Sequence, residues 1–153
     1  MKRKVLTKCE ALISFLKTLD EEDLGTNFKV PFLKPENLLL PEDYIFFMNW
    51  SNWFSVFGLE ILGIGNEKSD LIENIKWEQN ESNNLMPIYI IPFSPVGNGD
   101  FYCFDIKNGL KDGICPVIYW QWDYSSPDEY EYLADSFVDW LAFTINEMME
   151  EEE

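Results

Sequence analysis

Histidine is absent from this sequence of 153 residues. Without it, the chain cannot build a Ser-His-Asp or Cys-His catalytic centre, a histidine general base or a histidine-ligated metal site. Cysteine is scarce as well: Cys9, Cys103 and Cys115 make an odd number, with no Cys-x-x-Cys spacing. Because a chain of this length can bury a core without disulfides, we expect reduced thiols and a cytoplasmic protein.

Basic residues are also few, with 11 against 28 acidic residues and a net charge of -17. The imbalance is strongest in residues 101–153, which hold thirteen acids and only Lys107 and Lys111 as bases. Nucleic acids and anionic membranes attract proteins of the opposite charge, so we exclude both as partners. A basic protein would be drawn to this chain, although solubility alone is the simpler explanation of the same charge.

Long apolar runs are missing too. No uncharged apolar stretch reaches about 18 residues, so we expect no membrane-spanning helix. The start, MKRKVLTKCEALISFL, imitates a signal peptide, but Lys8 and Glu10 interrupt its apolar run and no small-residue cleavage site follows. Hydrophobic residues make up 46% and aromatic residues 16%, which is too apolar for a disordered chain. We therefore expect one folded domain over residues 1–153.

Hydrophobic periodicity predicts helices at both ends of the chain and strands between them. The expected helices cover residues 5–19, 41–52, 69–77 and 135–149. The expected strands cover residues 54–57, 59–64, 87–93, 101–106 and 116–123. Residues 24–40 are expected to be irregular and residues 124–133 to form an acidic loop. This order predicts an α+β fold with a mostly antiparallel central sheet flanked by N- and C-terminal helices, and the last three strands should form a meander.

The sequence Gly97-Asn98-Gly99-Asp100 invites two interpretations. A glycine-rich loop can hold phosphate, but such a loop normally leads into a helix N-terminus, whereas here a strand follows. No Lys-Ser/Thr pair comes after the glycines, and Asp100 would repel an anion. We interpret this segment as a tight hairpin turn, in which Gly and Asn tolerate positive φ.

A pair of carboxylates is the remaining candidate for a catalytic or metal site. Asp105 and Asp123 lie on neighbouring expected strands and could meet across the sheet, either for acid–base work or to hold a divalent metal. With 28 acids in the chain, chance proximity is common, so a carboxylate- or metal-dependent hydrolase is the least favoured alternative. Cys103 and Cys115 are expected to be buried in or beside the sheet rather than reactive. We therefore predict no catalytic, cofactor or metal site.

Four segments, taken in order, resemble the SUKH superfamily of Smi/Knr-type domains. Leu40–Tyr44 opens a helix that ends at Asn52, like the family's "LP…fl…NG" segment. Gly97–Asp105 is similar to its "G-x-G-D-x-Y-x-x-D" loop and strand, and Cys115–Trp120 to its "xPVxxW" strand. Ala134–Leu141 is similar to its closing "A-x-S-F-x-x-[FW]-L" helix. The resemblance covers roughly residues 36–145.

Six residues of these segments are expected to have a structural role rather than a binding role. They are Pro41, Gly97, Gly99, Pro116, Trp120 and Phe137. One departure is notable, because Trp53 stands where the family usually has a glycine after the first helix of the motif. Either the turn is made differently here, or Trp53 is displayed for another purpose.

The resemblance implies binding rather than catalysis. Bacterial relatives are similar to immunity proteins, which neutralise a toxin that is often a nuclease and therefore basic. We predict a non-catalytic immunity protein whose partner is a basic toxin, with a regulatory or scaffolding adaptor as the alternative. The expected contact residues form an acidic loop with two weaker additions: Asp123, Tyr124, Asp128, Glu129 and Glu131, then Asp100 and Trp53.

Overall fold

The computed structural model describes residues 1–67, 69–123, 126 and 129–152. In these residues the helices are α1 (Arg3–Leu16), α2 (Glu42–Trp50), α3 (Leu71–Asn80) and α4 (Phe137–Glu152). Each lies within three residues of its predicted bounds. Pro41 occupies the N-cap of α2, and its carbonyl accepts a hydrogen bond from the Ile45 N–H at 3.1 Å. The acidic first turn of α2 follows, as the helix dipole favours.

The strands form two antiparallel sheets. The smaller has the order β1-β2-β3, made of β1 (Leu24–Thr26), β2 (Phe54–Val56) and β3 (Leu59–Ile61). The larger has the order β4-β5-β6-β7, made of β4 (Ile90–Gly97), β5 (Asp100–Asp105), β6 (Val117–Trp120) and β7 (Glu131–Ala134). The predicted α+β class and the meander of the expected strands are confirmed. The prediction was wrong at β1 and β7, which lie in segments expected to be irregular.

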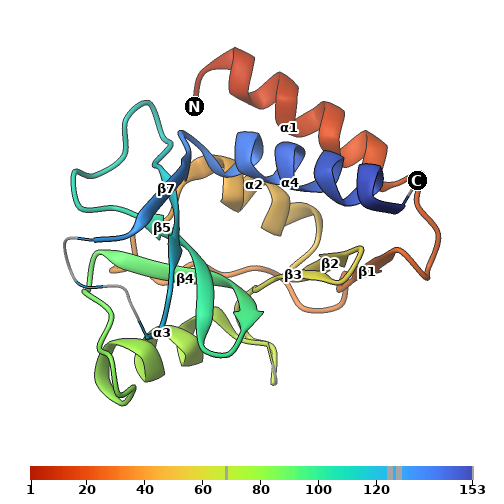
Figure 1. Cartoon of the computed structure of the whole chain (residues 1–153). Coiled ribbons are helices and arrows are strands. Elements are labelled where there is room, and N and C mark those ends of the chain that lie inside the picture. The colour runs from red at the N-terminus through yellow and green to blue at the C-terminus, as the bar shows by residue number, and fades with distance from the viewer. Residues whose placement is uncertain (68, 124–125, 127–128, 153) are drawn as a thin grey trace.

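The helices are divided between the two faces of the larger sheet. Figure 1 shows α1, α2 and α4 grouped on one side, with α3 at the opposite side. The helices of the larger group contact one another, and α3 contacts β4. Between the helix group and the sheet lies a large core whose centre is a set of touching aromatic rings: Tyr44, Phe47, Phe93, Phe104 and Phe137. Such ring pairs add about 1 kcal/mol each beyond their buried area.

The opposite face of the larger sheet carries its own small core. Its buried members are Met86, Ile90, Phe101, Cys103, Ile118 and Trp120. Residues alternate between the two cores along β5, since Phe104 belongs to the large core and Phe101 and Cys103 to the small one. The sheet is therefore buried on both faces over much of its length.

The start of α4 is tied to α2 by a buried carboxylate. Ser136 Oγ accepts the Asp139 N–H at 3.2 Å, and Asp43 Oδ2 accepts the Val138 N–H at 3.1 Å. Asp43 belongs to the first turn of α2 and is 0% exposed. These two acceptors satisfy backbone N–H groups that a helix N-terminus leaves without partners. The contact fixes how the closing helix sits against α2.

No helix in the described part of the chain combines the length and apolar character needed to cross a bilayer.

Candidate partner-binding surface

The Gly97–Asp100 segment is a hairpin turn, as predicted. Asn98 and Gly99 have φ of 57° and 85°, and Gly97 pairs with Asp100 across the turn. Positive φ at both central positions defines a type I′ turn, which suits the twist of the strands that it joins. A Cβ at Gly99 would lie 2.9 Å from the Trp122 side chain, so this position has no room for a larger residue.

Asp100 is held by the neighbouring strand. Its Oδ2 accepts the Tyr119 hydroxyl at 2.8 Å, and its Oδ1 accepts the Trp122 N–H at 3.0 Å. The chain leaves β6 after Trp120, earlier than the predicted end of that strand at Asp123. The Asp100 carboxylate thus stabilises this turn of the chain while remaining half-exposed.

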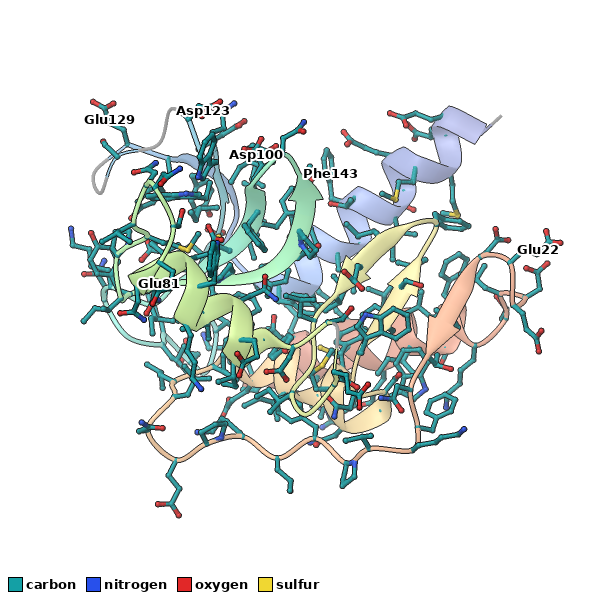
Figure 2. The ribbon with its side chains drawn as sticks, turned by 90° about the horizontal axis from the view of Figure 1, so that it is seen from below. Glu22, Glu81, Asp100, Asp123, Glu129 and Phe143 are labelled. Carbon is teal, nitrogen blue, oxygen red and sulfur yellow. The ribbon has the colours of Figure 1, made fainter. Side chains whose placement is uncertain are left out.

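The acidic loop extends from the end of β6. Asp123 and Glu129 are exposed, and Figure 2 shows both along one edge of the molecule together with Asp100. The Asn84 side chain donates to the Trp122 carbonyl at 2.7 Å, which anchors the start of the loop. Tyr124 and Asp128, the other predicted contacts of this loop, lie outside the described residues.

Glu131 is placed on the sheet rather than in a loop. It is the first residue of β7 and the Cα partner of Tyr119, which itself pairs with Tyr102. Cross-strand partners share a face, so Glu131, Tyr119 and Tyr102 line the same side of the sheet. Because Tyr119 binds Asp100, the structure brings Asp100 and Glu131 to one surface.

Trp53 is not part of that surface. It precedes β2 of the smaller sheet and adopts a φ of 92°, so it makes the turn in the conformation that glycine would take. A Cβ at Gly25 would lie 3.2 Å from its ring, and its Nε1 donates to Glu60 Oε2 at 2.9 Å. The indole is thus packed on its own sheet and is half-buried.

The prediction that Asp105 and Asp123 could meet across the sheet, on which the hydrolase alternative depended, was wrong. Asp105 ends β5, and its N–H donates to the Pro116 carbonyl at 3.0 Å. Asp123 lies beyond Trp120, whose partner is Phe101 near the other end of β5. The antiparallel register therefore places the two carboxylates at opposite ends of the strand pair. Asp105 Oδ2 instead accepts the Tyr130 hydroxyl at 2.9 Å.

The remaining motif residues are interior or structural. Phe137 and Trp120 are fully buried, and the rings of Tyr44 and Phe47 lie 5.6 and 5.4 Å from that of Phe137. Asn52 is missing from the predicted structural set, yet its amide holds both backbone groups of Ile64, at 2.9 and 2.7 Å. These motif residues position the strands and helices, leaving other side chains to form the surface.

All three thiols are buried, as predicted for Cys103 and Cys115. Burial is the largest cause that raises the pKa of all three, and it brings the pKa of Cys9 to about 12. A thiol with such a pKa is protonated at neutral pH and is a poor nucleophile. Among the described residues, no group of three or more potential ligands is placed to hold a metal ion.

An aromatic patch that the sequence did not reveal lies beside Asp100 and Glu131. The ring of Tyr102 contacts the rings of both Tyr119 and Trp140. Phe143 of α4 is 63% exposed next to them. One signal was present in the sequence, because Phe143 falls outside the helical spacing of the apolar residues Phe137, Leu141 and Ile145.

The family model described as SMI1 / KNR4 family (SUKH-1) matches residues 32–142. This match covers more than half of the chain and all four of the motif segments. No curated protein matches the sequence.

Proposed function

Because the chain belongs to the SMI1 / KNR4 family (SUKH-1), we propose that it is a non-catalytic immunity protein that binds and neutralises a basic protein toxin in the cytoplasm. The observation that carries this proposal is the charge, -17 overall and concentrated in the last third of the sequence. A nuclease is the expected class of toxin, because an enzyme that holds phosphate carries a basic surface.

The acidic surface around Asp123, Glu129 and Glu131 supports the proposal. All three side chains are exposed, and none forms an ion pair within the described residues. Exposed acids of this kind steer a basic partner into contact and raise the association rate more than the final affinity. A contact of standard size, about 1,600 Å² in total, is sufficient for a stable complex.

A toxicity-rescue experiment tests the function itself. A basic toxin captured with this protein in a pull-down from the native host is expressed in a heterologous host, with and without this protein. Growth restored by co-expression, together with a complex that survives gel filtration, is the expected result. Absence of both rescue and complex formation would contradict the immunity role and leave the adaptor as the better explanation.

Association kinetics then test the acidic surface. The triple variant Asp123→Asn, Glu129→Gln, Glu131→Gln should bind the same toxin about 10-fold more slowly at low salt, with a weaker salt dependence. The matched control replaces three exposed acids elsewhere, Glu21→Gln, Glu22→Gln and Glu36→Gln. Figure 2 shows Glu22 on the side of the molecule opposite Asp123 and Glu129. Equal slowing in both variants would show that only net charge matters.

A further inference from the structure

The aromatic patch has a defined floor and walls. The ring of Trp140 lies 4.8 Å from that of Tyr102, and Trp140 is only 3% exposed, so it forms the floor. Above it is a cleft of about 140 Å³, lined among others by Tyr102, Phe143, Thr144 and Glu147. We call this cleft, with Tyr119 and Glu131 beside it, the aromatic notch.

Carboxylates surround the aromatic notch. Asp100 binds the Tyr119 hydroxyl, and burial together with this hydrogen bond raises the pKa of Tyr119 to about 12. Glu147 lines the cleft together with Tyr102, and Glu131 is the cross-strand partner of Tyr119. Burial, followed by the charges of Glu147 and Glu131, raises the pKa of Tyr102. No lysine or arginine lines the cleft, and none of these carboxylates forms an ion pair within the described residues.

This combination fits a cationic side chain. Aromatic faces attract a cation with about 0.5–2 kcal/mol, depending on desolvation. Carboxylates at the rim can accept the N–H groups of a guanidinium, whose flat shape also stacks on rings. The cleft has the volume of roughly five water molecules, which suits the end of one long side chain rather than a helix or a strand.

We propose that the aromatic notch receives an arginine side chain from a basic protein partner. This inference rests on the proposed function, because it names the anchoring site for the toxin. Buried aromatic residues with arginine partners are typical hot spots of protein interfaces. Asp123 and Glu129 then steer the toxin, while the aromatic notch slows its dissociation. A second copy of this chain is a poor occupant, because both copies would carry a charge of -17.

A small-molecule titration tests the aromatic notch without any toxin. The probes are acetyl-arginine amide and its neutral analogue acetyl-citrulline amide, added at millimolar concentration to isotope-labelled protein. We expect the arginine probe to shift the Trp140 indole and the amides around Tyr102 and Phe143, with at least 5-fold weaker binding of the citrulline probe. Shifts spread evenly over exposed acids such as Glu22 and Glu129, or equal effects of both probes, would overturn the proposal.

The toxin complex gives the second test. Phe143→Ala and Glu147→Gln change exposed side chains, so both variants should fold, which thermal unfolding would check. Together they should accelerate toxin dissociation at least 10-fold and leave the association rate nearly unchanged. The control is Phe28→Ala, which removes a ring that is 68% exposed in the segment between β1 and α2.

The outcomes separate the two proposals. If the toxin is bound and neutralised equally well by the Phe143→Ala, Glu147→Gln variant, the aromatic notch is not the anchor and the immunity function stands. If no toxin binds but the arginine probe still occupies the notch, the immunity function fails and the notch remains a site for a cationic side chain.

Discussion

The two cores of this protein each enclose a carboxylate, but the two groups are treated differently. In the large core, Asp43 accepts the backbone N–H groups of Tyr44 and Val138 at 3.0 and 3.1 Å. In the small core, Glu78 is 6% exposed, and its Oε1 has no hydrogen-bond partner among the described residues. The Nε1 of Trp120, also buried there, lacks one too.

The hydrogen bonds of Asp43 help to organise the fold, whereas the Oε1 of Glu78, unpaired among the described residues, weakens it. Burial raises the pKa of both groups, since each loses water around its charge. Asp43 recovers part of that cost through hydrogen bonds that join α2 to α4. Glu78 has no such compensation at Oε1, and its charge also raises the pKa of the buried Cys103. Asp43, the buried carboxylate with hydrogen-bond partners, is therefore the one that lies in the family's Leu40–Tyr44 segment.

Replacing Asp43 should have the largest effect. Asp43→Ala leaves buried N–H groups at the start of α4 without an acceptor, so the free energy of unfolding should fall by about 3 kcal/mol. Urea unfolding at pH 6 measures this. The control Asp139→Ala removes an exposed carboxylate that pairs with Lys8 at 2.9 Å, and it should cost less than about 1 kcal/mol. Equal losses would mean that Asp43 does not hold α4.

The pH dependence of stability should follow from the same residue. Burial raises the pKa of Asp43 from 3.8 to about 6, so the folded state prefers its protonated form. Its contribution to stability is therefore complete below about pH 4 and declines as the pH rises through 6. Wild type should lose about 2 kcal/mol relative to Asp43→Ala between pH 4 and pH 7. Parallel stability curves of the two proteins would contradict the raised pKa.

Neutralising Glu78 should have the smallest effect, and of opposite sign. Because burial disfavours the charged carboxylate, Glu78→Gln should raise the free energy of unfolding by about 1 kcal/mol at pH 7. The gain should vanish near pH 4, where the wild-type side chain is neutral. Thermal unfolding at the two pH values provides the measurement. A loss of stability at pH 7 would reveal a partner for Glu78 and remove the contrast between the two cores.

Much of the fold could be predicted from local patterns. Helical spacing located all four described helices, and Asn98-Gly99 located the hairpin, because these features depend on residues near each other in the sequence. β1 and β7 were missed for the opposite reason. Leu24–Thr26 is short and becomes a strand only by pairing with β2, and the acidic residues around Glu131 concealed a strand that depends on β6.

For the candidate site, the sequence predicted a set of acidic contact residues and a basic partner. Asp123, Glu129 and Glu131 are exposed, and their contact with a basic partner stays a prediction. Trp53 was assigned to the same surface, yet the structure places it on the other sheet. Phe143 lies within the helix expected over residues 135–149, but the sequence does not show that it meets Tyr102, because Tyr102 comes from β5, far away along the chain.

By itself, the sequence determined the lack of histidine chemistry, the strong negative charge and the helices and hairpin that local residue patterns specify. Tertiary structure alone decided that Asp105 and Asp123 lie apart, that Asp43 caps a distant helix and that the notch combines aromatic rings with carboxylates. The physical reason is strand register and helix packing: these set which side chains become neighbours across long sequence separations, and composition and periodicity do not encode such pairs.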